Sequence, residues 1–175
     1  TCAETGVIGA LLALHILGLI DDRRAVSPLF KLIVMFGVAG IIATWSDSRL
    51  LEMVNALVGG TWLSIIITIL WLVAVTNALN FMDNMDGLAG GVAAVAGACF
   101  LAAALIQGQW FIAASLALLV GACSGFLIFN FAPAKIYMGD SGSLVIGFLL
   151  AFLTVRTTYV PAPLPQADET PALFA

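Results

Sequence analysis

Long apolar runs separated by short polar segments dominate the pattern of this chain. No charged residue occurs between Met53 and Met82, nor between Gly87 and Ala134. A helix needs about 20 apolar residues to cross the hydrocarbon core of a bilayer, so the second run is long enough for two spans. We therefore predict an all-α, polytopic membrane helix bundle with six helices, over residues 6–20, 29–45, 61–80, 88–106, 110–130 and 144–160.

Composition supports the membrane assignment. The chain is 62% hydrophobic and 9% charged, whereas an average soluble domain is about 25% charged. An ordinary soluble globular domain is thereby excluded. Four of the six prolines fall after residue 160. We expect a membrane-embedded core over residues 1–160 and an extended or disordered proline-rich tail over residues 161–175.

Half of the ten acidic residues gather in three clusters, which lie in predicted loops or at predicted helix ends. Carboxylates beside lipid are expensive, so their position points to function. Counting alternate helices places all three clusters on the same side of the membrane. The clusters are Asp21-Asp22, Asp83-Asn84-Met85-Asp86, and Asp140 in Met138-Gly139-Asp140-Ser141-Gly142.

The basic residues indicate which side this is. Four of them lie on the side of the acidic clusters and two on the opposite side. Because cytoplasmic loops carry an excess of Lys and Arg, the clusters are predicted to face the cytoplasm. The four are Arg23, Arg24, Lys31 and Lys135, and the two are Arg49 and Arg156.

The first cluster has two interpretations. Asp21 and Asp22 can be an interfacial charge pair that ends a helix. Two adjacent carboxylates also resist full ionisation unless a cation lies nearby, and Mg²⁺ takes oxygen ligands of this kind. Lys31, nine residues after Asp22, fits either a snorkelling anchor or a point charge that faces a phosphate.

The second cluster continues a polar helix face. Asn77, Asn80 and Asp83 follow one another at every third position, so they share one side of a helix. The asparagines alone fit hydrogen bonds between packed helices equally well. Together with Asp86 and Gly87 they indicate a binding site.

The third cluster contains Gly-Asp-Ser-Gly at residues 139–142, as in the nucleophile segment of trypsin-like proteases. Such a protease is excluded because the only histidine, His15, lies in an apolar run; we expect His15 to be a packing or hydrogen-bonded residue. The glycines suit close approach of the backbone to an anion at a helix start. Tyr137 offers an aromatic face on which a base can stack.

Three segments, in this order, resemble the polyprenyl-phosphate N-acetylhexosamine-1-phosphate transferases of glycosyltransferase family 4. The similarity extends from about Gly6 to Thr154. The family's earlier spans and its later loop rich in histidine and arginine have no counterpart here, so the resemblance implies a fragment or a chain that is inactive alone. The segments are Gly18–Arg24, Asn77–Leu88 and Tyr137–Gly147.

The resemblance implies a role for each matching residue. It implies catalytic roles for Asp21, Asp22 and Asp83, and a metal site for Mg²⁺ or Mn²⁺ formed by Asp140 and Asn80. It further implies binding of the substrate pyrophosphate and nucleotide by Lys31, Asn77, Asp86, Asn130 and Tyr137.

The implied reaction is transfer of a sugar 1-phosphate from a UDP-sugar to polyprenyl (undecaprenyl) phosphate, with release of UMP. The segment over residues 21–28 resembles the N-acetylglucosamine branch, which serves teichoic acid, lipopolysaccharide O-antigen and related cell-envelope polymers. The resemblance also implies the bacterial inner membrane as the location, a homodimer as one assembly, and no nucleic-acid partner.

Three alternatives remain open. One is the UDP-MurNAc-pentapeptide phosphotransferase branch of the same family, which makes peptidoglycan precursors. Another is a cation-coupled transporter, which predicts acidic residues near mid-span instead of at helix ends. The third is a non-catalytic membrane scaffold, which needs no convergence of the acidic clusters.

Overall fold

The described part of the chain consists of helices joined by short connections, which confirms the all-α prediction. The computed structural model describes residues 2–45, 49–50 and 60–158, with side chains from Gly6 onward. The helices are α1 (Cys2–Arg23), α2 (Pro28–Trp45), α4 (Trp62–Met82), α5 (Leu88–Ile106), α6 (Trp110–Asn130) and α7 (Gly139–Thr158). The predicted tail over residues 161–175 lies outside the described residues.

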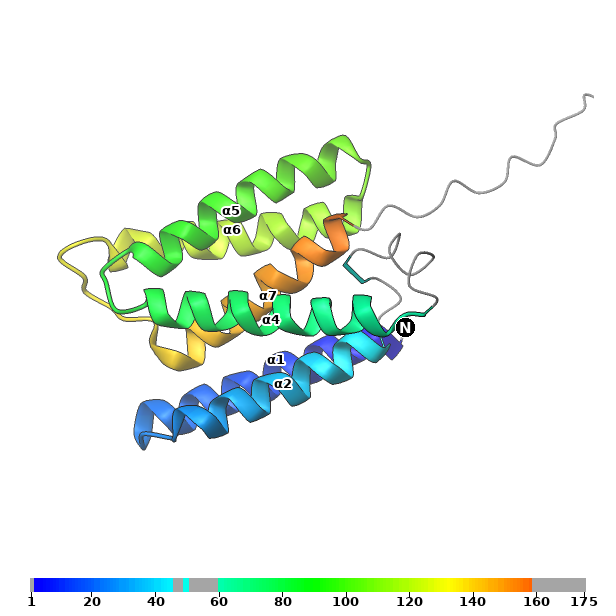
Figure 1. Ribbon diagram of the computed structural model, residues 1–175. Helices are drawn as coiled ribbons and strands as arrows, with labels where there is room; N and C mark the ends of the chain where they lie inside the picture. The colour runs from blue at the N-terminus through cyan, green and yellow to red at the C-terminus, as the bar shows by residue number, and fades with distance from the viewer. Residues whose placement is uncertain (1, 46–48, 51–59, 159–175) are drawn as a thin grey trace, which may run out of the picture.

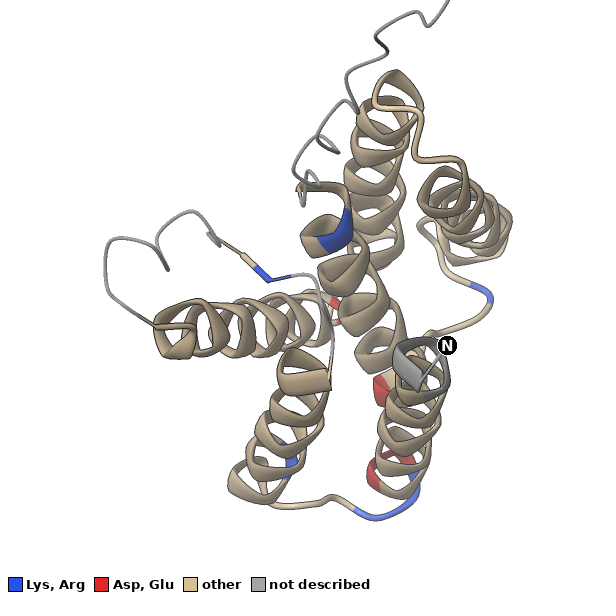
Figure 2. Cartoon of the chain, turned by 90° about the vertical axis from the view of Figure 1, so that its right-hand side faces the viewer, with Lys and Arg blue, Asp and Glu red and all other residues tan. Residues whose placement is uncertain are grey.

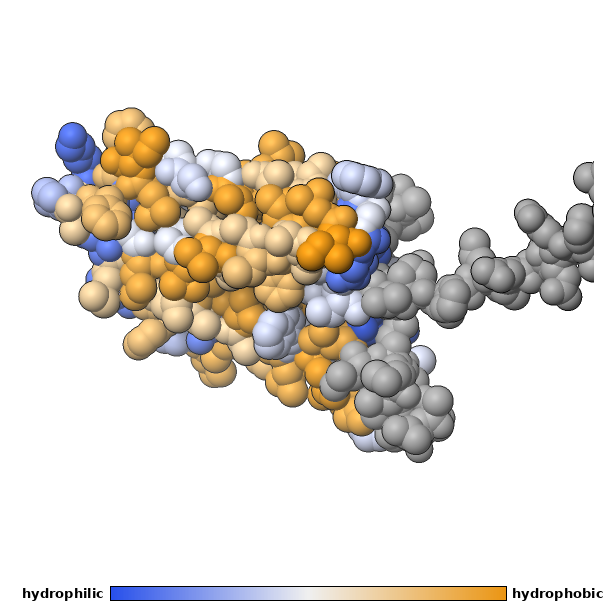
Figure 3. All heavy atoms as spheres, turned by 90° about the horizontal axis from the view of Figure 1, so that it is seen from above, coloured by the Kyte–Doolittle hydropathy of each residue, from blue (hydrophilic) through white to orange (hydrophobic). Residues whose placement is uncertain are grey.

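Five of the described helices, α2 and α4 to α7, are long and apolar enough to cross a membrane. α1 is not among them, and its last turn carries Asp21, Asp22 and Arg23. Charged segments are sparse and lie mainly at helix ends and in connections (Figure 2). Apolar side chains cover most of the face seen in Figure 3, and hydrophilic residues gather toward its two ends. These features fit a bundle embedded in a bilayer.

Two helix boundaries differ from the prediction at the acidic clusters. α1 continues to Arg23 instead of ending at residue 20, and α7 begins at Gly139 instead of residue 144. Asp21, Asp22 and Asp140 therefore lie in helical turns and not in loops. Each of these side chains has a polar partner: Asp22 bonds to free amides at the start of α7, and Asp21 and Asp140 bond to Lys31.

α7 is the central helix of the bundle. It contacts α1, α4, α5 and α6, while α1 with α2 and α5 with α6 form antiparallel pairs around it (Figure 1). Half of the 20 residues of α7 are buried, against four of the 18 residues of α2. The position of α7, and so of its first residues, is therefore fixed by contacts with several helices.

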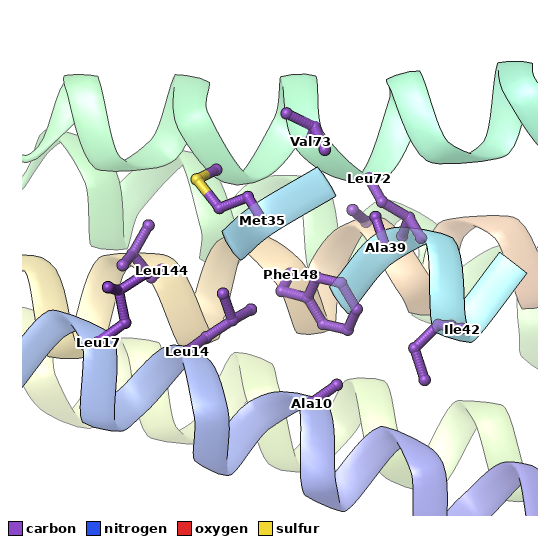
Figure 4. Close-up of a cluster of buried hydrophobic side chains, with 11 residues drawn as sticks. Ala10, Leu14, Leu17, Met35, Ala39, Ile42, Leu72, Val73, Leu144 and Phe148 are labelled. Carbon is purple, nitrogen blue, oxygen red and sulfur yellow. The ribbon is translucent and has the colours of Figure 1, made fainter. Parts of the chain in front are cut away.

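Apolar side chains from α1, α2, α4 and α7 form one continuous core (Figure 4). Leu14 and Leu72 are fully buried, and Phe148 of α7 lies between them with 2% of its surface exposed. In lipid, helices associate through close packing more than through a hydrophobic driving force. Tight fit between these side chains is therefore what orients the four helices.

Gly147 allows the closest approach between α4 and α7. A Cβ at this position would lie 2.9 Å from Thr76 Cα and 3.1 Å from Thr76 O, both backbone atoms. No side-chain movement relieves such a clash, so the two helices would have to separate.

We expect Gly147→Ala to destabilise the protein by about 1–3 kcal/mol, as overpacking of a dense core does. The matched control is Gly37→Ala, because Gly37 lies within α2 and a Cβ there meets nothing within 4 Å. Thermal unfolding in detergent measures the difference. Equal melting temperatures for the two variants would contradict this account of the α4–α7 contact.

Candidate functional site

The three acidic clusters meet at one end of the bundle. α1 ends with Asp21 and Asp22, α4 ends just before Asp83, and Asp140 lies in the first turn of α7. α7 contacts both α1 and α4, and the connections that follow α1, α4 and α6 lie at the same end of the molecule (Figure 1). The prediction that the clusters share one side is confirmed.

Lys31 links two of the clusters. It lies in the first turn of α2, and its Nζ is 2.7 Å from Asp21 Oδ2 and 2.6 Å from Asp140 Oδ2. The side chains of Lys31, Asp21 and Asp140 are 20, 13 and 26% exposed. Charge-assisted hydrogen bonds of this length are strong, and partial burial strengthens them further. We call these three residues the Lys31 bridge.

Asp21 is also held by the backbone. Its Oδ1 accepts a hydrogen bond from the Val26 N–H at 2.6 Å, in the connection between α1 and α2. The neighbouring Asp140 side chain and then the Lys31 ammonium hold the pKa of Asp21 at about 2, although burial acts in the opposite direction. Asp21 is therefore a carboxylate at neutral pH, and its charge can hold a cation.

Asp22 caps the start of α7. Its Oδ1 accepts the Asp140 N–H at 2.8 Å and its Oδ2 accepts the Ser141 N–H at 3.2 Å. The first amides of a helix have no partner within it and form the positive end of its dipole, so a carboxylate stabilises them. Gly139, with φ at +66°, brings the backbone close enough that a Cβ would lie 3.0 Å from both Asp22 oxygens.

Asp83 lies against the same helix start. It is half-buried at the end of α4, and its carboxylate lies beside the Gly139 N–H. Burial raises the pKa of Asp83, the Gly139 N–H opposes the rise, and the charges of Asp140 and Asp22 add to it. Two of the three predicted catalytic carboxylates thus hold the turn that carries Asp140.

Asn80 reaches this turn through a hydroxyl group. Asn80 Nδ2 donates to Ser143 Oγ at 2.9 Å, and Ser143 Oγ donates to Gly139 O at 3.0 Å. The two predicted metal ligands, Asp140 and Asn80, are therefore both attached to the first turn of α7.

A divalent cation at this end would need ligands from outside the protein in addition to the predicted Asp140 and Asn80. Among the described residues, no group of three or more Asp, Glu, His or Cys side chains gathers in a way that could hold a metal. Mg²⁺ usually binds one or two carboxylates and takes its other oxygens from substrate phosphates and water. Asp21 and Asp140 already hold one cation between them, the Lys31 ammonium. A closed cage made only of protein ligands does not fit.

A second polar network connects two loops at the same end. Asn130 Oδ1 accepts the Gly87 N–H at 3.0 Å, and Asn130 Nδ2 donates to Ile136 O at 2.8 Å. Asp86 Oδ2 accepts the Ala134 N–H at 3.0 Å. Asn130 is only 4% exposed, so its amide bonds within the protein. The network ties the α4–α5 connection to the α6–α7 connection, and the predicted nucleotide contacts of Asp86 and Asn130 stay predictions.

Asn77 and Tyr137 complete the predicted set, and both are exposed. Asn77 lies on α4, and Tyr137 lies in the α6–α7 connection with 78% of its surface exposed. Neither takes part in the two networks described above. The open ring of Tyr137 has the accessibility that a stacking surface requires.

Gly18 and His15 also contact the first turn of α7, although neither was among the predicted site residues. A Cβ on Gly18 would lie 2.4 Å from Ser141 Cα and N, so glycine is needed for α1 to approach α7 here. His15 Nδ1 lies 3.2 Å from Ser141 O, which confirms the expectation of a hydrogen-bonded histidine. The available signal was spacing, since His15, Gly18 and Asp22 share one face of α1.

Comparison with known proteins agrees with this geometry. The sequence model described as glycosyl transferase family 4 matches residues 5–158. The chain is 32% identical over 155 residues to the protein of Bacillus subtilis (strain 168) named probable undecaprenyl-phosphate N-acetylglucosaminyl 1-phosphate transferase. This alignment covers 87% of this chain and 43% of the relative. It is 34% identical over 158 residues to the phospho-N-acetylmuramoyl-pentapeptide-transferase of Limosilactobacillus fermentum, which covers 83% of this chain and 50% of the relative.

The chain thus spans half or less of the length of these two relatives. The matched region nevertheless contains the three acidic clusters, Lys31 and all the helices that position them. On this match, the chain belongs to glycosyl transferase family 4.

Proposed function

We propose that this protein transfers N-acetylglucosamine 1-phosphate from a UDP-sugar to polyprenyl phosphate and releases UMP. The Lys31 bridge carries the proposal, because it gathers two carboxylates and an ammonium group from three helices at one end of an apolar bundle. Such a group can hold a cation and a phosphate together where a lipid headgroup lies. The Bacillus subtilis relative is named for the same lipid phosphate and sugar 1-phosphate.

The proposed reaction is a displacement at phosphorus. An oxygen of the lipid phosphate attacks the phosphorus that bears the sugar, and the bond from that phosphorus to the bridging oxygen breaks. The electron pair of the broken bond leaves with UMP, and the sugar phosphate ends on the lipid as a diphosphate. The lipid phosphate is already an oxyanion at neutral pH, so the attack needs no obligatory general base.

Each of these residues has its own role in the proposed reaction. Asp140 and Asn80 would hold Mg²⁺ or Mn²⁺, and when bound this ion neutralises the pyrophosphate and polarises the attacked phosphorus. Lys31 would donate to a phosphate oxygen as a point charge. Asp21, ionised at neutral pH, orients Lys31 by charge. Asp22 and Asp83 fix the turn from which Asp140 extends.

The site end is proposed to face the cytoplasm of a bacterial inner membrane. Four basic residues lie at this end, in or next to its connections and helix starts, and two lie at the other end. The direction of this bias supports the assignment. A UDP-sugar and a lipid headgroup would then meet on the side where nucleotide sugars are made. The four are Arg23, Arg24, Lys31 and Lys135.

One observation favours a second sugar donor, UDP-MurNAc-pentapeptide. The Limosilactobacillus fermentum relative is named for a phospho-N-acetylmuramoyl-pentapeptide, and it is as similar to this chain as the Bacillus subtilis relative. Turnover by the full-length protein with UDP-N-acetylglucosamine, and none with UDP-MurNAc-pentapeptide, supports the first donor. Turnover with UDP-MurNAc-pentapeptide alone would support the same class of reaction with that sugar donor instead.

We expect Asp140→Asn to lower Mg²⁺-dependent release of UMP from a UDP-sugar by more than about 100-fold, the scale seen when one electrostatic group of a site is removed. The assay uses full-length protein and polyprenyl phosphate. Asn84→Ala is the control, because Asn84 is an exposed amide in the α4–α5 connection. Undiminished turnover in Asp140→Asn would remove Asp140 from the mechanism.

Accessibility of single cysteines tests the orientation of the site. Ala25→Cys, Asn84→Cys and Ser141→Cys, each in a background without the native cysteines, are expected to react with an impermeant thiol reagent only from the cytoplasmic side. Gln107→Cys, in the connection between α5 and α6, is expected to react only from the outside. A mixed pattern among the first three would break the assignment of one shared face.

A further inference from the structure

His15 is a polar residue on an apolar surface of α1. Leu12, Ile16 and Leu19 on the same helix are 56, 55 and 39% exposed, and His15 is itself exposed. An imidazole among exposed apolar side chains is costly to desolvate unless it has a hydrogen-bond partner. The partner here is Ser141 O, 3.2 Å from Nδ1.

This contact fixes which ring nitrogen carries the proton. A backbone carbonyl oxygen only accepts hydrogen bonds, so Nδ1 must be the donor. In the neutral ring, Nε2 is then the unprotonated nitrogen, because the bond made by one nitrogen sets the state of the other. The carbonyl has two lone pairs, so it can accept this bond in addition to its bond within α7.

His15 belongs to a line of three residues that hold the first turn of α7. His15, Gly18 and Asp22 lie at i, i+3 and i+7 on α1, which is one face of a helix. Asp22 takes the Asp140 and Ser141 N–H groups, and Gly18 lets the two backbones touch at Ser141. His15 binds the carbonyl of the same residue. The turn is therefore held on its amide side and on its carbonyl side at once.

We propose that His15 is a positioning residue for Asp140, acting through the hydrogen bond from its Nδ1–H to Ser141 O. The inference rests on the proposed function, because it gives His15 a task only if Asp140 holds the cation of the transfer reaction. Without His15, the turn pivots on the Asp22 bonds, and the Asp140 carboxylate shifts relative to Lys31. Displacements of about 1 Å in a reacting site are enough to lower rates strongly.

Three substitutions of His15 distinguish the role of Nδ1 from that of Nε2. The side-chain N–H of asparagine can occupy the place of Nδ1, whereas the amide of glutamine extends to the place of Nε2, and leucine offers neither. In full-length protein we expect His15→Leu and His15→Gln to raise the Mg²⁺ concentration for half-maximal UMP release by up to about tenfold, the scale of one ordinary hydrogen bond. His15→Asn is expected to stay within about threefold of the native protein.

Leu12→Val is the matched control, because Leu12 lies one turn away on the same exposed surface. It is expected to leave the Mg²⁺ dependence unchanged. If the native protein releases UMP and His15→Leu has the native Mg²⁺ dependence, the positioning role is wrong and the proposed function stands. Equal impairment of the asparagine and leucine variants also overturns it. A native protein without transferase activity overturns the proposed function itself.

Nitrogen NMR of imidazole-labelled protein gives a readout that does not depend on turnover. The ring signal of His15 is identified by its loss in His15→Asn. We expect this signal to show a protonated Nδ1 and an unprotonated Nε2. A ring protonated only at Nε2 cannot donate to Ser141 O, and that result overturns the proposal whatever the activity.

Discussion

The carboxylate caps on the first turn of α7 are the interaction on which the rest of the site depends. Amides at a helix start have no partner within the helix, so they need one from outside it. Asp22 accepts hydrogen bonds from two of these amides, those of Asp140 and Ser141, and the Asp83 carboxylate lies beside the amide of Gly139. The same contacts attach α1 and α4 to α7. Fold and site are therefore stabilised by one set of contacts.

The pattern of apolar residues alone predicted the helix bounds well where a helix ends with its apolar run. The predicted ranges 88–106 and 110–130 coincide with α5 and α6. The prediction was wrong at the site, where α1 runs to Arg23 and α7 starts at Gly139. An apolar run ends at its first polar residue, but α7 begins before its apolar run because the Asp22 carboxylate stabilises its first amides.

The members of the site followed from motifs and helix counting, but their pairing did not. Asp21 and Asp22 are neighbours in sequence, yet they project from α1 about 100° apart. For this reason Asp21 forms an ion pair with Lys31, whereas Asp22 bonds to the backbone of α7. Asn130 bonds to the backbone of Gly87 and Ile136, which lie in two different connections. No periodicity in the sequence connects such positions, because tertiary packing alone brings them together.

The balance of charge around the Lys31 bridge constrains how substrates enter. Asp21 and Asp140 contact a single ammonium group, and Asp22 and Asp83 lie at the same start of α7, so carboxylates outnumber the ammonium group in this inner region. Arg23 and Arg24 are exposed at the end of α1, outside it. The outer arginines draw an anion toward the surface, while the inner carboxylates repel a bare phosphate. If the proposed function holds, a nucleotide diphosphate is therefore expected to arrive together with its divalent cation or after it, never before.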